Sequence, residues 1–245
     1  MKPLTPDDTV VYAIGDLHGR LDLLDEIHRR ILTDLEGRTA RRRQLVYLGD
    51  YVSRGADSRG VVDRVREWLP AGFERITLKG NHEDLLLRFV DGEFEAGRHW
   101  FDYGGLDTLA GYGVDIPDRE ARDPASVAEL GRRFAAALPA EHLEFFRALA
   151  ISHRAGDFFF VHGGVRPGIA LERQATHDRM WIRKAFLDSE ADHGAVVVHG
   201  HSISHVPELR HNRIGIDTGA YRSGVLTCLV LEGGRREILQ TAGPA

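Results

Sequence analysis

The first half of the chain repeats one pattern three times: a short apolar run, a polar loop that contains glycine, and a stretch with apolar residues at helical spacing. The apolar runs lie at 9–15, 44–50 and 75–81, and the helical stretches at 20–35, 57–69 and 82–90. A short apolar run predicts a buried strand, and apolar positions every three or four residues predict a helix with one buried face. Three such units in succession predict an α/β fold with sites at the strand ends.

The pattern changes after the third unit. Between residues 85 and 148 there is no strand pattern, and 126–138 and 139–149 have helical spacing, so we expect an inserted helical cap. Strands are expected again at 149–152, 157–163, 195–201, 213–219 and 224–233, with one helix near 178–187. Since no low-complexity linker or fixed repeat divides the chain, we expect one domain over residues 1–245.

Composition narrows the class of protein. The chain has 245 residues, of which 42% are hydrophobic and 28% charged, which is typical of a globular protein. A net charge of −5 argues against a nucleic-acid partner, because phosphate binding normally needs a basic excess. No stretch has the length of a membrane span or the pattern of a signal peptide, so we expect a cytoplasmic protein. The single cysteine, Cys228, lies in an apolar alternating run and is expected to be buried in a strand.

Residues of metal-ligating type follow several of the expected strands. They are Asp16 and His18 in "GDLHG", Asp50 in "GDYVSRG", Asn81, His82 and Glu83 in "GNHE", His162 in "VHGG", and His199 and His201 in "VHGHS". Any one of these clusters could be a helix cap or a turn, but five clusters at strand ends favour a site. These ligand types suit Mn²⁺, Fe or Zn²⁺. Their number predicts two metals that share a carboxylate, an arrangement suited to phosphate-ester hydrolysis.

The motifs "GDLHG", "GDYVSRG" and "GNHE", followed by "VHGG", "GHS" and "IDTGA", resemble those of a known family. They are similar to the motifs of PPP-type serine/threonine phosphoprotein phosphatases, in the calcineurin-like metallophosphoesterase superfamily, and to the bacterial and phage members above all. The resemblance covers residues 10 to 231. It implies a metallophosphoesterase β-sandwich of two mixed sheets flanked by helices, with the metals at its edge.

The resemblance also implies a set of metal ligands. Asp16, His18 and Asp50 would hold the first metal, and Asp50 would bridge to the second, which is held further by three residues: Asn81, His162 and His201. Two divalent or mixed-valence ions are expected, Mn in first place and Fe or Zn as alternatives.

Several positions near these motifs have no assigned ligand role. Ile203 stands where many relatives outside the PPP branch have a second histidine. His199 has an open role, and an exchange of ligand role with His201 remains an alternative. The remaining histidines have no motif support and are expected to be structural or exposed: His28, His99, His142, His153, His177, His193, His205 and His211.

Roles in catalysis follow from the same resemblance. Arg54 and Arg183 would bind the phosphate, although Arg183 could instead be a packing residue on a helix. His82 would be the general acid for the leaving group, and a hydroxide that bridges the two metals would attack phosphorus. Asp217 in "IDTGA" would support the metal loops.

Ser53 departs from the family pattern, in which this position is usually aspartate. An aspartate there orients the general-acid histidine and raises its pKa. Ser53 brings no charge, and Asp57 or Glu83 are the candidates to compensate. We therefore expect reduced activity toward poor leaving groups, and a gain of alkyl-phosphatase activity in Ser53→Asp.

The function that we favour from the sequence is metal-dependent hydrolysis of phosphomonoesters by a serine/threonine protein phosphatase. The expected partner is a phosphorylated protein or a small phosphoester. A nucleotide or dinucleoside polyphosphate hydrolase of the same superfamily is the alternative, and the acidic net charge makes a nuclease the weakest enzymatic option. From another class, a non-catalytic module that binds phospho-ligands would keep the fold, but it would not need the complete ligand set.

Overall fold

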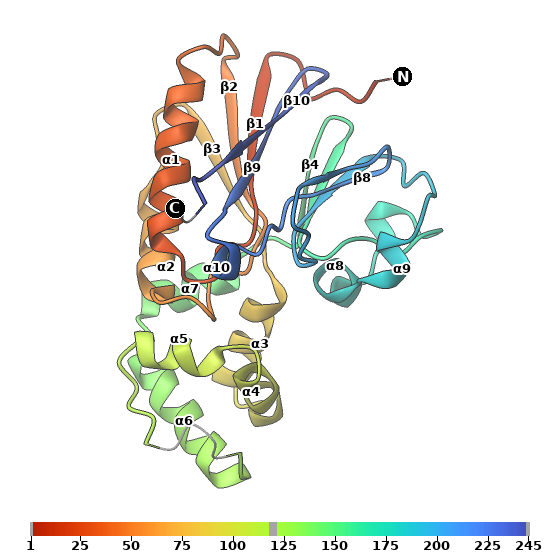
Figure 1. The fold of residues 1–245 in the computed structure, drawn as a ribbon. Helices are drawn as coiled ribbons and strands as arrows, with labels where there is room; N and C mark the ends of the chain where they lie inside the picture. Colours follow the sequence, from red (N-terminus) through yellow and green to blue (C-terminus); the bar gives the residue numbers. More distant parts are fainter. Residues whose placement is uncertain (1, 118–121, 244–245) are drawn as a thin grey trace.

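The computed structural model describes residues 2–117 and 122–243. Two mixed five-stranded sheets face each other in it (Figure 1). The first comprises β1 (Thr9–Ile14), β2 (Arg42–Tyr47), β3 (Phe73–Thr77), β9 (Thr227–Glu232) and β10 (Arg235–Gln240), in the spatial order β10-β9-β1-β2-β3. The second comprises β4 (Ser152–Ala155), β5 (Phe158–Val161), β6 (Val196–His199), β7 (Glu208–Leu209) and β8 (Arg213–Gly215), in the order β4-β5-β6-β8-β7. This arrangement confirms the expected α/β sandwich.

Helices cover the outer faces of both sheets (Figure 1). On the side of the first sheet lie α1 (Leu21–Leu35), α2 (Ser58–Glu67), α3 (Asn81–Val90) and the cap helices α4 (Phe94–Phe101), α5 (Gly105–Gly111), α6 (Pro124–Ala137) and α7 (Ala140–Ala148). On the side of the second sheet lie the short 3₁₀ helix Leu171–Arg173, α8 (Thr176–Trp181) and α9 (Lys184–Leu187), and α10 (Ala220–Ser223) precedes β9.

Strand β1 shows how sequence alternation builds the layers. Val10, Tyr12 and Ile14 belong to the core between the first sheet and its helices. Val11 and Ala13 point to the opposite face and belong to the core between the two sheets. Since both faces of β1 are covered, the strand is apolar throughout, as expected for a buried strand. Cys228 in β9 is buried in the first of these cores, as the sequence predicted.

Helix α8 ends where the sequence analysis expected a helix to continue. The single helix expected near 178–187 is two helices, because Ile182 has extended backbone angles (φ −62°, ψ 141°). This turn of the chain buries the Ile182 side chain in a third core, with Phe186 and Val197 beneath the second sheet. Arg183 therefore lies at the junction between α8 and α9 and not within a helix, which corrects the expectation of a helical packing residue.

The second half also differs from expectation in its strands. The strand expected at 149–152 begins only at Ser152, and Ala150 forms an isolated bridge with Leu78. Strands β7 and β10 were not expected; β10 lies at the edge of its sheet, and its mixture of charged and apolar residues hides the strand pattern.

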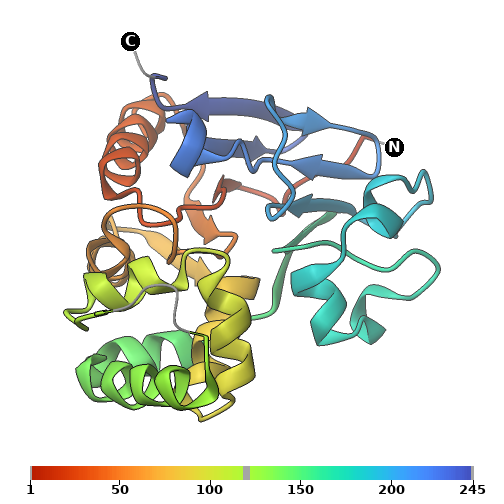
Figure 2. The same ribbon diagram turned by 60° about the horizontal axis from the view of Figure 1, so that its bottom comes forward.

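The expected cap is formed by α4 to α7, and residues 118–121 of the predicted 85–148 range lie outside the described residues. Figure 2 shows these helices, yellow to green, on one side of the strand ends, and α8 and α9 on another side. Helix α3 begins earlier than the cap, at Asn81, so its first turn lies directly after β3. Among residues 2–117 and 122–243, no helix is long and apolar enough to cross a membrane.

Candidate active site

The predicted ligands converge on Asp50, which follows β2 and is buried. Its Oδ1 lies 3.4 Å from His162 Nε2, and its Oδ2 lies 3.5 Å from His18 Nε2. Two groups of potential ligands share this carboxylate: His18, Asp50 and His82, and Asp50, His162 and His201. Asn81 joins them, because its Oδ1 lies 3.0 Å from His162 Nε2. The loops that follow five different strands thus bring these side chains together around one carboxylate.

The backbone of this site is strained. Six described residues other than glycine have positive φ, and five of them lie here: His18, Asp50, Ser53, Arg54 and His201. Each such conformation costs roughly 1–3 kcal/mol and persists only where the surroundings impose it. The concentration of these residues at one place supports a functional role for the loops.

Glu83 imposes the conformation of the loop after β2. Its buried carboxylate accepts hydrogen bonds from the backbone N–H groups of Asp50 (2.9 Å), Tyr51 (2.9 Å) and Gly80 (3.0 Å). Sequence analysis had considered Glu83 as a residue of metal-ligating type and as a substitute for the missing aspartate at position 53. Its place three residues after the N-cap Gly80, which is the capping-box spacing, was the available signal for the role that the structure reveals.

The side chain of Ser53 forms a hydrogen bond with a residue of the helical cap. Its fully buried Oγ accepts a hydrogen bond from Trp100 Nε1 at 2.9 Å, and its backbone N–H donates to Ser58 Oγ at 3.0 Å. Asp57 is also occupied, because it caps α2 by accepting from the Gly60 N–H. His82 Nδ1 is buried and has no hydrogen-bond partner among the described residues. Neither candidate carboxylate, therefore, orients the ring of His82.

Two buried atoms indicate that the cluster fits cations. Asp16 Oδ1 and His201 Nε2 have no hydrogen-bond partner among the described residues, while Asp16 Oδ2 accepts the backbone N–H of His201 at 3.0 Å. An unsatisfied buried acceptor costs roughly 1–3 kcal/mol. Carboxylate, imidazole and amide donors are together suited to divalent ions such as Mn²⁺ and Zn²⁺. The donor set thus fits the metals that the sequence implied.

Burial and neighbouring charges shift the pKa values of several residues in the cluster. Burial raises the pKa of Asp16 well above its usual range, and the neighbouring Asp217 adds to this shift. Burial would also raise the pKa of Asp50, but the charges of His162 and His82 hold it well below its usual range. Burial would lower the pKa of His162, yet Asp50 and Asp16 raise it to about 10. The carboxylates of the site therefore favour positive charge close to Asp50, as the raised pKa of His162 shows.

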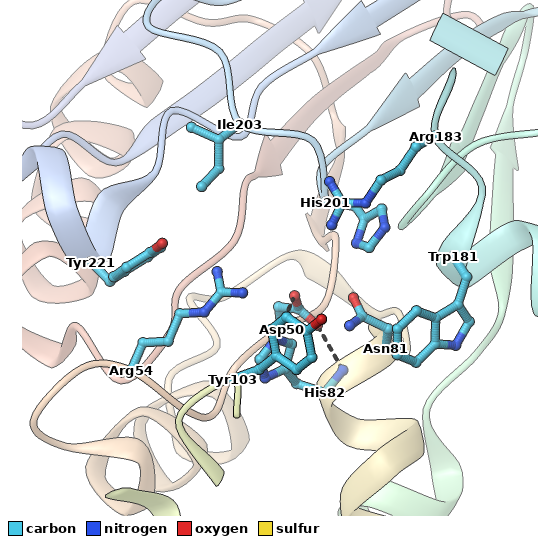
Figure 3. A pocket seen from close by; sticks show the side chains of 10 residues that line it. All are labelled: Asp50, Arg54, Asn81, His82, Tyr103, Trp181, Arg183, His201, Ile203 and Tyr221. Carbon is cyan, nitrogen blue, oxygen red and sulfur yellow. Dashed lines mark hydrogen bonds and ion pairs between the residues drawn. The ribbon is translucent and has the colours of Figure 1, made fainter. Parts of the chain in front are cut away.

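A cavity of about 460 Å³ opens over Asp50 (Figure 3). It is lined by Asp50, Arg54, Asn81, His82, Tyr103, Trp181, Arg183, His201, Ile203 and Tyr221. Arg54 donates to His18 Nε2 at 3.1 Å, and its guanidinium lies 4.7 Å from the centre of the Tyr221 ring. Arg183 lies on the side of His201 (Figure 3). Both predicted phosphate-binding arginines therefore line one cavity with the ligand cluster.

The other predicted residues have clear places. Asp217 is buried and accepts the Gly219 N–H at 2.9 Å. His199 lies outside the ligand cluster, with Nε2 3.4 Å from Arg213 Nη1, so the structure brings His201 and not His199 to Asp50.

Among the histidines without motif support, two have structural surroundings in the helical layer. His28 stacks on Trp68 at 3.6 Å. His142 lies between the Tyr112 hydroxyl (2.8 Å) and Asp63 (2.7 Å). Both are buried, as expected of structural residues.

The aromatic lining of the cavity was missed by the sequence analysis. Tyr103 follows α4 in the cap, Trp181 ends α8, and Tyr221 lies in α10. These positions are far apart in the chain and belong to none of the ligand motifs except that Tyr221 follows "IDTGA". Their proximity results from the packing of the cap and of α8 around the strand ends.

The sequence matches the calcineurin-like phosphoesterase family over residues 9–224. The chain belongs to this family, whose members are hydrolases that act on phosphoester bonds.

Two curated relatives are bis(5'-nucleosyl)-tetraphosphatases of the symmetrical type. The one from Nitrosospira multiformis is 28% identical over 201 residues, which are 82% of this chain and 60% of the relative. The one from Acidovorax sp. (strain JS42) is 30% identical over 161 residues, which are 64% of this chain and 44% of the relative. The chain thus spans about half of the length of these relatives.

A solved structure described as a putative diadenosine tetraphosphatase has the same fold. It covers 98% of this chain and 96% of its own, with a TM-score of 0.64 and 20% identity.

Proposed function

We propose that the protein hydrolyses a phosphoanhydride bond in a nucleoside polyphosphate, with a dinucleoside tetraphosphate as the representative substrate. The observation that carries this proposal is the hydrogen bonding of the His82 ring. Its Nδ1 has no hydrogen-bond partner among the described residues, and Ser53, where the family pattern has aspartate, bonds to Trp100 instead. His82 Nε2 lies 3.8 Å from Asp50 Oδ2, beyond hydrogen-bond distance, so the histidine expected to act as general acid has no carboxylate hydrogen-bonded to its ring to orient it.

The two classes of substrate differ in their leaving group and therefore in their need for a proton donor. The alkoxide that leaves from phosphoserine or phosphothreonine is a strong base, so its departure needs a well-placed proton donor. When water cleaves a phosphoanhydride, the P–O bond to the second phosphate breaks, and the leaving phosphate is a stable anion at neutral pH. A site with a poorly supported acid is therefore better suited to an anhydride than to an alkyl ester.

The chain's own residues would share the remaining tasks. Divalent ions held at the cluster would neutralise phosphate charge and acidify a water molecule. Arg54 and Arg183, on different sides of the cavity, would bind phosphate oxygens through charge-assisted hydrogen bonds. Glu83 would keep Asp50 in place through its hydrogen bonds to the loop backbone. We propose Mn²⁺ as the native ion, with Fe and Zn²⁺ as the alternatives.

The relatives support this choice of substrate. Both curated relatives described above carry the tetraphosphatase name, which favours the polyphosphate alternative over the protein phosphatase that the sequence motifs favoured. A non-catalytic binding module is disfavoured, because buried, unsatisfied ligand atoms and strained loops are costly to retain without chemistry.

The test is a comparison of kcat/KM on the Mn²⁺-loaded protein. The substrates are diadenosine tetraphosphate, ATP, a phosphoserine peptide, a phosphothreonine peptide and 4-nitrophenyl phosphate. We expect the highest value for diadenosine tetraphosphate and the lowest values for the two peptides.

Two variants control this comparison. Asp50→Asn should abolish turnover, which excludes a contaminating hydrolase, and Arg41→Ala, an exposed arginine outside the cavity, should leave it unchanged. A phosphopeptide as the best substrate would restore the protein phosphatase hypothesis. Absence of turnover on every substrate would leave the binding module.

A further inference from the structure

Two aromatic residues that line the cavity, Tyr103 and Trp181, are joined by two neighbouring rings, those of His99 and His177. We call these four side chains the aromatic shelf. They come from two parts of the fold, α4 with the turn after it and α8. The ring centres of His99 and Tyr103 lie 5.0 Å apart, those of His99 and Trp181 6.2 Å, and those of His177 and Trp181 6.0 Å. One continuous group of rings therefore spans the space between the cap and the second sheet.

The shelf is accessible. Tyr103 is 44% exposed, His99 and His177 are exposed, and Trp181 is half-buried. Isolated exposed aromatic residues are common, but a group of rings in mutual contact at a polar cavity usually marks a binding surface. The described residues contain no other aromatic group that lines this cavity on the same side.

The shelf begins directly beside the candidate active site. The Trp181 ring centre lies 6.3 Å from that of His201, and the Tyr103 ring centre lies 6.5 Å from that of His82. Trp181 and Arg183 are two residues apart, and both line the cavity (Figure 3). A flat group joined to a phosphate held by Arg183 can therefore reach these rings.

The opposite side of the cavity has a different character. There Tyr221 is covered by the Arg54 guanidinium, at 4.7 Å from the ring centre, so its face is already occupied (Figure 3). Among the residues that the structure describes, no cation lies over the rings of the shelf. Since every nucleobase has a flat face that stacks on aromatic side chains, the shelf suits a base while Arg54 and Arg183 suit phosphates.

We propose that the aromatic shelf is a nucleobase subsite, which binds the base of the nucleotide whose phosphates lie between Arg54 and Arg183. This inference rests on the proposed function for the position of the phosphates. It adds that recognition of the nucleoside comes from stacking on Trp181 and Tyr103 and not from the ligand cluster.

The test separates the base from the phosphates. The dissociation constants of ADP and of inorganic pyrophosphate are measured by calorimetry on the Mn²⁺-loaded protein. The ratio of the pyrophosphate constant to the ADP constant gives the contribution of the nucleoside. We expect ADP to bind more tightly than pyrophosphate. Trp181→Ala should weaken ADP binding about 5- to 150-fold more than pyrophosphate binding, the range that stacking on one aromatic residue provides.

Further variants keep the test independent of folding. Tyr103→Ala removes an exposed ring and should change the ratio in the same direction, whereas Trp181→Phe keeps a ring and should retain most of it. His211→Ala is the matched control for His99→Ala, because His211 is exposed and lines a different cavity. We expect His99→Ala to lower the ratio and His211→Ala to leave it unchanged.

The results that would overturn the nucleobase subsite differ from those that would overturn the proposed function. Equal affinities for ADP and pyrophosphate in the unaltered protein would overturn the subsite, as would a Trp181→Ala variant that weakens both ligands equally. Failure of the proposed function would instead appear as an absence of diadenosine tetraphosphate hydrolysis, which does not enter the ratio of the two constants.

Discussion

The hydrogen bond between Ser53 and Trp100 joins the cap to the loop that carries Asp50 and Arg54, and its removal should be measurable. Both side chains are fully buried, and the distance is 2.9 Å. Ser53→Ala leaves the Trp100 Nε1–H without an acceptor, which costs about 1–3 kcal/mol. For a chain of this size, 1 kcal/mol lowers Tm by about 2–4 °C, so we expect a decrease of about 2–12 °C.

A double-mutant cycle isolates the hydrogen bond itself. Ser53→Ala, Trp100→Phe and the double variant are compared by urea unfolding, and the free energies of unfolding should be non-additive by about 0.5–1.5 kcal/mol. Because the bond holds the residue next to Arg54, each variant should also lower kcat/KM. Additivity within about 0.3 kcal/mol would refute the reasoning, since the two side chains would then contribute independently.

Three further predictions concern other parts of the fold. Burial lowers the pKa of His28 to about 3, so the unfolded chain binds more protons than the folded chain between pH 3 and 6.5. Protonation of His28 in the unfolded chain should therefore lower the free energy of unfolding by about 2 kcal/mol at pH 5, but not near pH 7.5. Urea unfolding at the two pH values measures this difference, and His28→Gln should remove it. Gly104→Ala places a Cβ 2.6 Å from the Arg54 backbone N and should lower both Tm and kcat/KM, whereas Gly113→Ala, also at positive φ but facing open space, should lower only Tm. Ser53→Asp should raise the alkyl-phosphate to anhydride activity ratio and lower Tm, because the new carboxylate is buried; an unchanged ratio would show that the site is organised around serine.

The ligand cluster could be predicted from sequence because its residues follow strands. The carboxyl ends of neighbouring parallel strands meet at one edge of a sheet, so Asp16 after β1, Asp50 after β2 and Asn81 after β3 are necessarily close. The spacing of residues within single segments was therefore enough to predict most of the metal ligands. The same holds for the α/β layers, because β1 and α1 bury residues at the spacings expected of a strand and a helix.

The remainder depends on contacts between distant segments. Trp100 and Ser53, which form a hydrogen bond, are 47 residues apart in the sequence. The aromatic shelf forms because α4 and α8 pack near each other. No local sequence pattern predicts the hydrogen bond or the shelf. The break at Ile182 is likewise set by a core that β6 and α9 complete. Edge strand β10 was missed because its exposed face interrupts the apolar pattern.

The central claim, that His82 is a poorly supported acid and the site therefore prefers good leaving groups, is tested most directly by leaving-group dependence. The measurement is kcat/KM of the Mn²⁺-loaded protein and of His82→Ala for a series of aryl and alkyl phosphates whose leaving groups increase in pKa. We predict a steep decrease with rising leaving-group pKa in the unaltered protein, and nearly the same slope in His82→Ala. A shallow dependence that becomes steep only in His82→Ala would contradict the account, because His82 would then be an effective proton donor.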